Sequence, residues 1–170
     1  HRVSTVKKSN GHSILRIIAY INARKLSNNL TGDEHNFSHK SGIIETGFYM
    51  PHGIKTDMTE EQFYNHIENN SHASTNIIAY SSILSLPSEL NIENQKKLVQ
   101  DFCKHFTETY KTAVSFAIHE ADNIKRKKAK LDEIEKHNLP VHDDDLRMQV
   151  QNNHVHLVMP YCKIEELNQS

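Results

Sequence analysis

The chain alternates short apolar runs with polar segments that are rich in turn-forming residues. Alternation of apolar and polar residues, or an apolar run bounded by Pro, Gly or Asn, predicts a strand, whereas apolar residues three and four positions apart predict a helix. These patterns predict strands at residues 1–8, 42–51, 76–87, 112–122 and 150–161. They predict helices at residues 14–26, 57–70 and 89–110, and a polar loop at 28–42 with room for a short hairpin. Because helices and strands do not alternate regularly, the pattern favours an α+β fold with a central, mainly antiparallel sheet and flanking helices.

Length and composition indicate one domain over residues 1–170, since 36% of the residues are hydrophobic and 24% are charged. No apolar run reaches the length of a bilayer span, so we expect no membrane insertion and a cytoplasmic location. The net charge of −1 argues against bulk electrostatic binding to nucleic acid but allows a local basic groove. Cys103 and Cys162 lack metal-finger spacing, and a reduced pair is favoured over one disulfide.

A charged insert is predicted at about residues 122–149, between the last two strands. Five basic residues lie within 125–130, and acidic residues follow at 143–145. The favoured interpretation is a solvated helix followed by a loop, and the alternative is a basic finger that binds nucleic acid.

Three histidines fall on two of the predicted strands. With 13 histidines in 170 residues, a His-x-His pair such as "HVH" is expected about once by chance, so its setting must supply the evidence. Alternation places His119 on a strand face of small residues, and His154 and His156 on one face of the last strand. If these strands pair, three imidazoles converge with open positions beside them, as in a catalytic metal site. The alternative is a solvated sheet face without an ion.

Tyr20 lies in the first predicted helix, with Arg16 and Arg24 four residues to either side. That spacing places the two guanidinium groups on the same helix face as the phenol, where a phosphate could bind. Cationic neighbours also favour the phenolate form of a tyrosine. The alternative is an ordinary tyrosine at a helix interface.

The order of these parts resembles the MobA/MobL family of plasmid mobilisation relaxases, which are HUH endonucleases. The resemblance rests on "GHSILRIIAYINARKL", "LTGDEHNFSHKSGII", "LPSELNIENQKKLVQDF", "VSFAIHEAD" and "NNHVHLVMP", and therefore runs through nearly the whole chain. Its most specific part is "AIH" followed downstream by the pattern N-x-H-x-H-L, here "NNHVHL". Because the family often appends further domains, we expect the chain to be the N-terminal part of a longer bacterial protein.

The resemblance implies that Tyr20 is a nucleophile and that His119, His154 and His156 bind one divalent ion. Such an enzyme nicks one DNA strand at a transfer origin, keeps the 5′ end as a phosphotyrosine and leaves a free 3′-OH. Mn²⁺ or Mg²⁺ is the ion expected from the family, although three imidazoles suit Mn²⁺, Zn²⁺ or another transition ion better than Mg²⁺. The expected partners are single-stranded origin DNA, relaxosome accessory proteins and a type IV secretion coupling protein. The candidate phosphate contacts are Arg16, Arg24, Lys25, Lys7 and Lys8.

The chain departs from the family pattern in two places. Ser81 and Ile83 stand where the family usually has two glutamates, so the general base is unassigned; Glu45, Glu120 or a metal-bound hydroxide are the substitutes considered. In addition, 34 residues separate His119 from His154, where the family has a short turn. Two alternatives therefore stay open, a DNA-binding module that has lost efficient cleavage and a three-histidine metal hydrolase unrelated to DNA.

Overall fold

The computed structural model describes residues 2–54, 57–70, 76–121, 132, 135–137, 152–161 and 164. The charged insert predicted at about 122–149 lies almost entirely outside these residues, as does Cys162. The strands are β1 (Arg2–Lys7), β2 (Lys25–Ser27), β3 (Glu34–Asn36), β4 (Ile43–Tyr49), β5 (Ile77–Ser85), β6 (Val114–His119) and β7 (His154–Pro160). The helices are α1 (Ile14–Ile21), α2 (Glu60–Asn70) and α3 (Ile92–Tyr110), and a 3-10 turn, η1 (Lys8–Asn10), follows β1.

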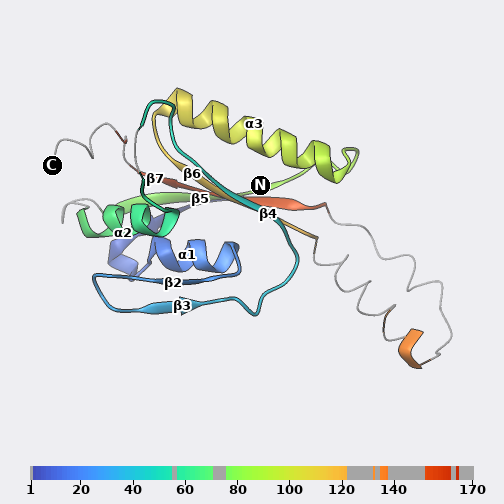
Figure 1. The fold of residues 1–170 in the computed structure, drawn as a ribbon, viewed down its shortest axis with the longest axis horizontal. Coiled ribbons are helices and arrows are strands. Elements are labelled where there is room, and N and C mark those ends of the chain that lie inside the picture. Colours follow the sequence, from blue (N-terminus) through green and yellow to red (C-terminus); the bar gives the residue numbers. More distant parts are fainter. Residues whose placement is uncertain are drawn as a thin grey trace.

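Five strands form a sheet in the order β1-β5-β7-β6-β4, and every neighbouring pair is antiparallel. The five strands predicted from the sequence are these five, and the α+β fold with an antiparallel sheet and flanking helices is confirmed. Strands β6 and β7, which are distant in the sequence, lie side by side at the centre of the sheet (Figure 1).

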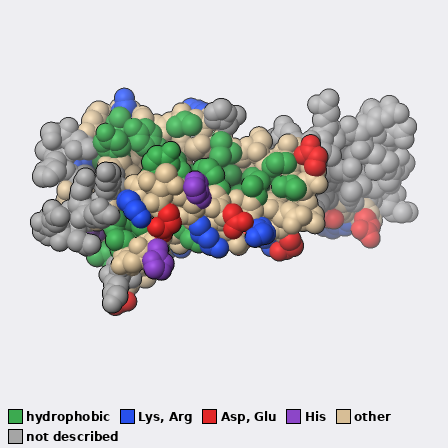
Figure 2. Space-filling view, turned by 90° about the horizontal axis from the view of Figure 1, so that it is seen from above, with side chains coloured by type: hydrophobic (Ala, Val, Ile, Leu, Met, Phe, Trp, Pro, Cys, Tyr) green, Lys and Arg blue, Asp and Glu red, His purple; other side chains and the backbone are tan. Residues whose placement is uncertain are grey.

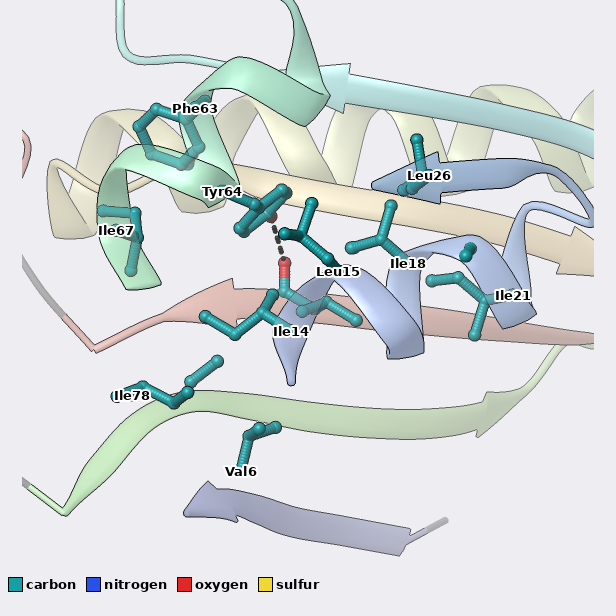
Figure 3. Close-up of a cluster of buried hydrophobic side chains, with 14 of the residues drawn as sticks. Val6, Ile14, Leu15, Ile18, Ile21, Leu26, Phe63, Tyr64, Ile67 and Ile78 are labelled. Carbon is teal, nitrogen blue, oxygen red and sulfur yellow. Dashed lines mark hydrogen bonds between the residues drawn. The ribbon is translucent and has the colours of Figure 1, made fainter. Parts of the chain in front are cut away.

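Helices cover both faces of this sheet (Figure 1). Helix α3 packs on the face that carries Val114, Phe116 and Ile118, whereas α1 packs on the face that carries Ala113 and Ala117. The sequence favours a sheet with the histidines on one face and the helices on the opposite face, and this arrangement is wrong in one respect, because α1 also covers the face of the histidines. The small side chains of β6 leave space on the histidine face, and the apolar stripe of α1 fills it (Figure 3).

Helix α1 begins and ends at identifiable signals. The hydroxyl of Ser13 accepts a hydrogen bond from the Arg16 N–H at 3.2 Å, which is the usual N-cap arrangement. The helix ends at Ile21, and Ala23 adopts the left-handed region with φ of 49°. The helix predicted over residues 14–26 is therefore too long by five residues, because the chain turns back and pairs as β2 with β3. This hairpin lies alongside α1, away from the sheet (Figure 1).

Helix α2 fixes both ends of α1 through two partly buried carboxylates. Near the start of α1, Glu68 accepts hydrogen bonds from the Ser13 hydroxyl at 2.9 Å and from the Ile14 and Leu15 N–H groups, the latter at 3.2 Å. Beyond its end, Glu60 pairs with Arg24 and accepts from Asn22 at 3.3 Å. The position of Tyr20 above the sheet thus depends on α2.

Helix α3 closes the other face with a second apolar cluster. Cys103 is fully buried there as a free thiol, and burial raises its pKa to about 12. None of the helices in the described part of the chain combines the length and the apolarity that a bilayer crossing requires.

Candidate metal and nucleophile site

The antiparallel register of β6 and β7 brings the three histidines together. His119 lies directly opposite His154, and Ala117 lies opposite His156. The imidazole centroids are 4.5 to 5.4 Å apart, and a ring nitrogen of each lies within 4.8 Å of those of the other two. The predicted convergence of the three side chains is confirmed, and their binding of an ion stays a prediction.

Hydrogen bonding at His119 and burial at His156 favour forms of these two side chains that can bind a metal. Nε2 of His119 lies 2.6 Å from the carbonyl oxygen of Ile21, which can only accept, so this nitrogen carries the proton and Nδ1 is left as the donor to an ion. Burial, followed by the neighbouring histidines and Lys40, lowers the pKa of His156 to about 3. His156 is therefore neutral at physiological pH. Three nitrogen donors on adjacent strands fit a divalent transition ion with coordination positions left for water or substrate.

Tyr20 and His156 line the same groove, which has a volume of about 700 Å³. Tyr20 is 47% exposed. The groove runs between β1 and α1, and its polar or charged lining residues include Arg2, Ser4, His12, Ser13, Arg16 and Ser81. The candidate nucleophile and one of the three histidines therefore line one open groove.

The five predicted phosphate contacts lie in different surroundings. Arg16 lines the groove. Arg24 is not on α1 at all; it pairs with Glu60, and Lys25 pairs with Glu34 at 2.6 Å. Neither Lys7 nor Lys8 is among the residues that line the groove. Contacts of these five residues with DNA stay predictions, and only Arg16 has the position that the groove favours.

The two positions where glutamates were expected do face the histidines. Ile83 lies opposite His156 across β5 and β7, and Ser81 lines the groove. Glu45 lies opposite Ile118 and accepts a hydrogen bond from Gln100 of α3 at 2.8 Å, so it points to the other face of the sheet. Glu45 therefore cannot act as the base for Tyr20 in this arrangement.

Sequence reasoning missed three residues around Tyr20. Arg2 lines the groove from an edge strand, on the same face as His156 through the register of β1, β5 and β7. Phe37 contacts the Tyr20 ring edge-on at a centroid distance of 5.4 Å, and Lys40 lies above that ring. Both belong to a segment predicted only as polar loop, where periodicity carries no signal.

Comparison with known proteins gives concordant similarities. The family model described as MobA/MobL family matches residues 12–169. The mobilization protein MobL of Acidithiobacillus ferridurans is 24% identical over 163 residues, covering 94% of this chain and 41% of that protein. The chain thus spans about two fifths of the length of this relative. A solved structure described as the molecular basis of vancomycin resistance transfer in Staphylococcus aureus superposes with a TM-score of 0.69 at 16% identity, covering 94% of this chain and 68% of that one. This likeness shows a shared fold.

Proposed function

This chain belongs to the MobA/MobL family, and from that premise we propose that it is the relaxase domain of a mobilisation protein. In this proposal it nicks one strand of DNA at a transfer origin, with Tyr20 as the nucleophile and His119, His154 and His156 as the ligands of one divalent ion. The observation that carries the proposal is the common groove, since Tyr20 and His156 line one cavity although they are 136 positions apart in the sequence.

The chemistry is a transesterification. The hydroxyl oxygen of Tyr20 attacks the scissile phosphorus and loses its proton, the bond from phosphorus to the 3′ oxygen breaks, and that oxygen leaves with a proton as a 3′-OH. The 5′ end stays on Tyr20 as a phosphodiester. A divalent ion on the three histidines would polarise the phosphate and stabilise the charge that builds on it. Arg16 would hold the neighbouring phosphate in the groove. The hydrogen bond from Nε2 of His119 to the carbonyl of Ile21 would keep Nδ1 of His119 oriented towards the ion.

The three imidazole ligands affect which divalent ion the site would bind. Mn²⁺ and Mg²⁺ are expected from the family, but an all-imidazole set binds Mn²⁺, Zn²⁺ or another transition ion better than Mg²⁺. We therefore propose that Mn²⁺ supports nicking at lower concentration than Mg²⁺ does. The proposed partners are single-stranded origin DNA in the bacterial cytoplasm, relaxosome accessory proteins and a type IV secretion coupling protein.

A second candidate function is DNA binding without efficient cleavage. The observation in its favour is that Ser81 and Ile83 occupy the positions beside the histidines where the family usually has glutamates. At these two positions, therefore, no carboxylate can accept the proton of Tyr20. In this case the domain would place other components at the origin rather than nick it.

A covalent-adduct assay separates these functions. A labelled single-stranded oligonucleotide that contains the origin is incubated with the protein and Mn²⁺, and the products are separated under denaturing conditions. We expect an adduct with the native protein and none with Tyr20→Phe, which should still bind the oligonucleotide and the ion because only the hydroxyl is lost.

Tyr80→Phe is the matched control. Tyr80 lies opposite Met159 and contacts the ring of Tyr161 at 5.7 Å, which places it on the face away from the histidines. That variant should form adduct at the native rate. Binding without adduct by the native protein supports the second function, and adduct formation by Tyr20→Phe contradicts the assignment of the nucleophile.

A further inference from the structure

Lys40 contacts the candidate nucleophile in two ways. Its Nζ donates a hydrogen bond to the carbonyl oxygen of Tyr20 at 3.0 Å and lies 3.1 Å from the centroid of the Tyr20 ring. The turn that carries Lys40 is closed by a hydrogen bond from its N–H to the carbonyl of Phe37 at 3.0 Å. Phe37 in turn contacts the Tyr20 ring edge-on. The segment from Phe37 to Lys40 therefore contacts the nucleophile through both an aromatic ring and a cation.

The charge of Lys40 is not neutralised by any carboxylate within ion-pair distance among the described residues. An ammonium group above an aromatic ring is attracted to it, most strongly where water is partly excluded, and Lys40 is partly buried. Lys40 thus lies against Tyr20 as a cation that no described carboxylate neutralises.

We propose that Lys40 is a positioning residue, which holds the ring of Tyr20 in the orientation needed to attack a phosphate bound beside the three histidines. This inference rests on the proposed function. A tyrosine that is 47% exposed would otherwise sample several rotamers, since few contacts would favour one of them. Fixing one rotamer matters because a displacement of about 1 Å in a reacting group can cost about 100-fold in rate.

The first test needs neither DNA nor metal. Proteins with ¹³C-labelled tyrosine rings are compared by nuclear magnetic resonance, and the Tyr20 signals are identified by their loss in Tyr20→Phe. In Lys40→Met the side chain keeps most of its length but loses its charge, so we expect the Tyr20 ring signals to shift and those of Tyr110 to stay. Lys40→Arg should bring the Tyr20 signals back towards their native positions, because a guanidinium group also stacks on an aromatic face.

The second test is kinetic and uses the adduct assay. Lys40→Met should slow the single-turnover formation of adduct at saturating oligonucleotide by about 10- to 100-fold, with an oligonucleotide Kd within about threefold of native. Lys40→Arg should recover most of the rate. Lys97→Met is the matched control, since Lys97 is an exposed lysine of α3, paired with Asp101 at 3.2 Å on the other side of the sheet. It should change neither the Tyr20 signals nor the rate.

The outcomes separate this inference from the proposed function. Unchanged Tyr20 signals in Lys40→Met overturn the inference even if the native protein nicks DNA. A loss of oligonucleotide affinity at an unchanged single-turnover rate overturns it in favour of a phosphate contact. If Lys40→Met does not fold, as judged by circular dichroism, the same comparison is made between Lys40→Gln, Lys40→Arg and the native protein. If the native protein forms no adduct, the proposed function fails, and the ring signals still decide whether Lys40 positions Tyr20.

Discussion

At the residue scale, the three histidines have the same side chain but different surroundings. His119 is 6% exposed and bonded to the carbonyl of Ile21, so it joins β6 to the end of α1. His154 and His156 are partly buried on β7 and face the other two imidazoles. From the sequence, replacing His154 or His156 is expected to abolish cleavage while sparing the fold, and the hydrogen bond to Ile21 gives His119 a structural role as well.

This difference gives a prediction on stability. In metal-free protein, His119→Ala should lower the free energy of unfolding by about 1 to 3 kcal/mol, because the Ile21 carbonyl loses its partner in a buried place. His156→Ala should cost less, since no hydrogen bond to the backbone is removed. Urea unfolding with a chelator present measures both values.

His119→Ala and His156→Ala should both weaken the binding of Mn²⁺ strongly. Each removes one of three proposed ligands, so each should weaken Mn²⁺ binding by more than the about 10- to 100-fold typical of losing a group that only orients a ligand. Titration calorimetry measures this. Equal losses of stability in the two variants would contradict a structural role for His119, and native Mn²⁺ affinity in either would exclude that residue from the ligand set.

Some residues of the site can be predicted from the sequence, and others cannot. The histidines could be predicted because alternation along a strand fixes which face a side chain occupies, and the pairing of β6 with β7 then brings them together. Lys40 and Phe37 could not, because their positions depend on how a loop folds back on α1. Arg2 lies on an edge strand, and its distance from His156 follows only from the strand order, which the sequence pattern leaves open.

At the element scale, α1 is a short helix whose orientation is set by its neighbour α2. Its eight residues supply too few internal hydrogen bonds for independent stability, so tertiary contacts must hold it. Glu68 supplies the contact at the N-terminus, where a carboxylate both accepts from free N–H groups and interacts favourably with the helix dipole. The nucleophile thus depends on a carboxylate two turns away.

We predict that Glu68→Ala destabilises the protein by about 1 to 3 kcal/mol, because it leaves the Leu15 N–H and the Asn28 side-chain amide without their acceptor. Glu93→Ala is the matched control. Glu93 lies in the first turn of its own helix, α3, and is exposed and paired with Lys96 at 2.9 Å, so its loss should cost less than about 1 kcal/mol.

Urea unfolding of both variants tests this comparison. Glu68→Ala should also slow adduct formation, since the start of α1 is released, while oligonucleotide binding changes less. Equal and small costs for the two variants would show that α1 is held by its apolar stripe alone.

The wrong end predicted for α1 has a physical cause at this scale. Residues 21–26 contain Ala, Arg, Lys and Leu, which are good helix formers, so local propensity extends the helix. Tertiary contacts override this helical propensity. Arg24 pairs with Glu60, and Leu26 is buried in β2, which pairs with β3. The prediction that Arg24 lies on the same helix face as Tyr20 assumed a helix that continues to residue 26. Because α1 ends at Ile21, that prediction is wrong.

At the scale of the whole molecule, charge is distributed differently on the two sides. On the side of α3, basic and acidic side chains are interspersed (Figure 2), and several of them form ion pairs within α3 or at its C-terminal end. On the other side, Arg2 and Arg16 line the groove, and neither has a carboxylate partner within ion-pair distance among the described residues. A net charge of −1 therefore does not exclude a track for phosphates.

This distribution predicts how binding of single-stranded DNA depends on salt. Each phosphate contact on a single strand contributes about 0.7 to the slope of log affinity against log salt concentration, because it releases condensed counterions. Replacing Arg2 and Arg16 together by Gln should therefore flatten the slope by up to about 1.4 and weaken binding at low salt. The measurement is fluorescence anisotropy across a salt series, in the Tyr20→Phe background so that no covalent adduct forms. Lys97→Gln, on the side of α3, is the control and should leave the slope unchanged. A native slope in the double arginine variant would mean that the strand does not follow this groove, whereas equal flattening by Lys97→Gln would indicate binding by diffuse charge.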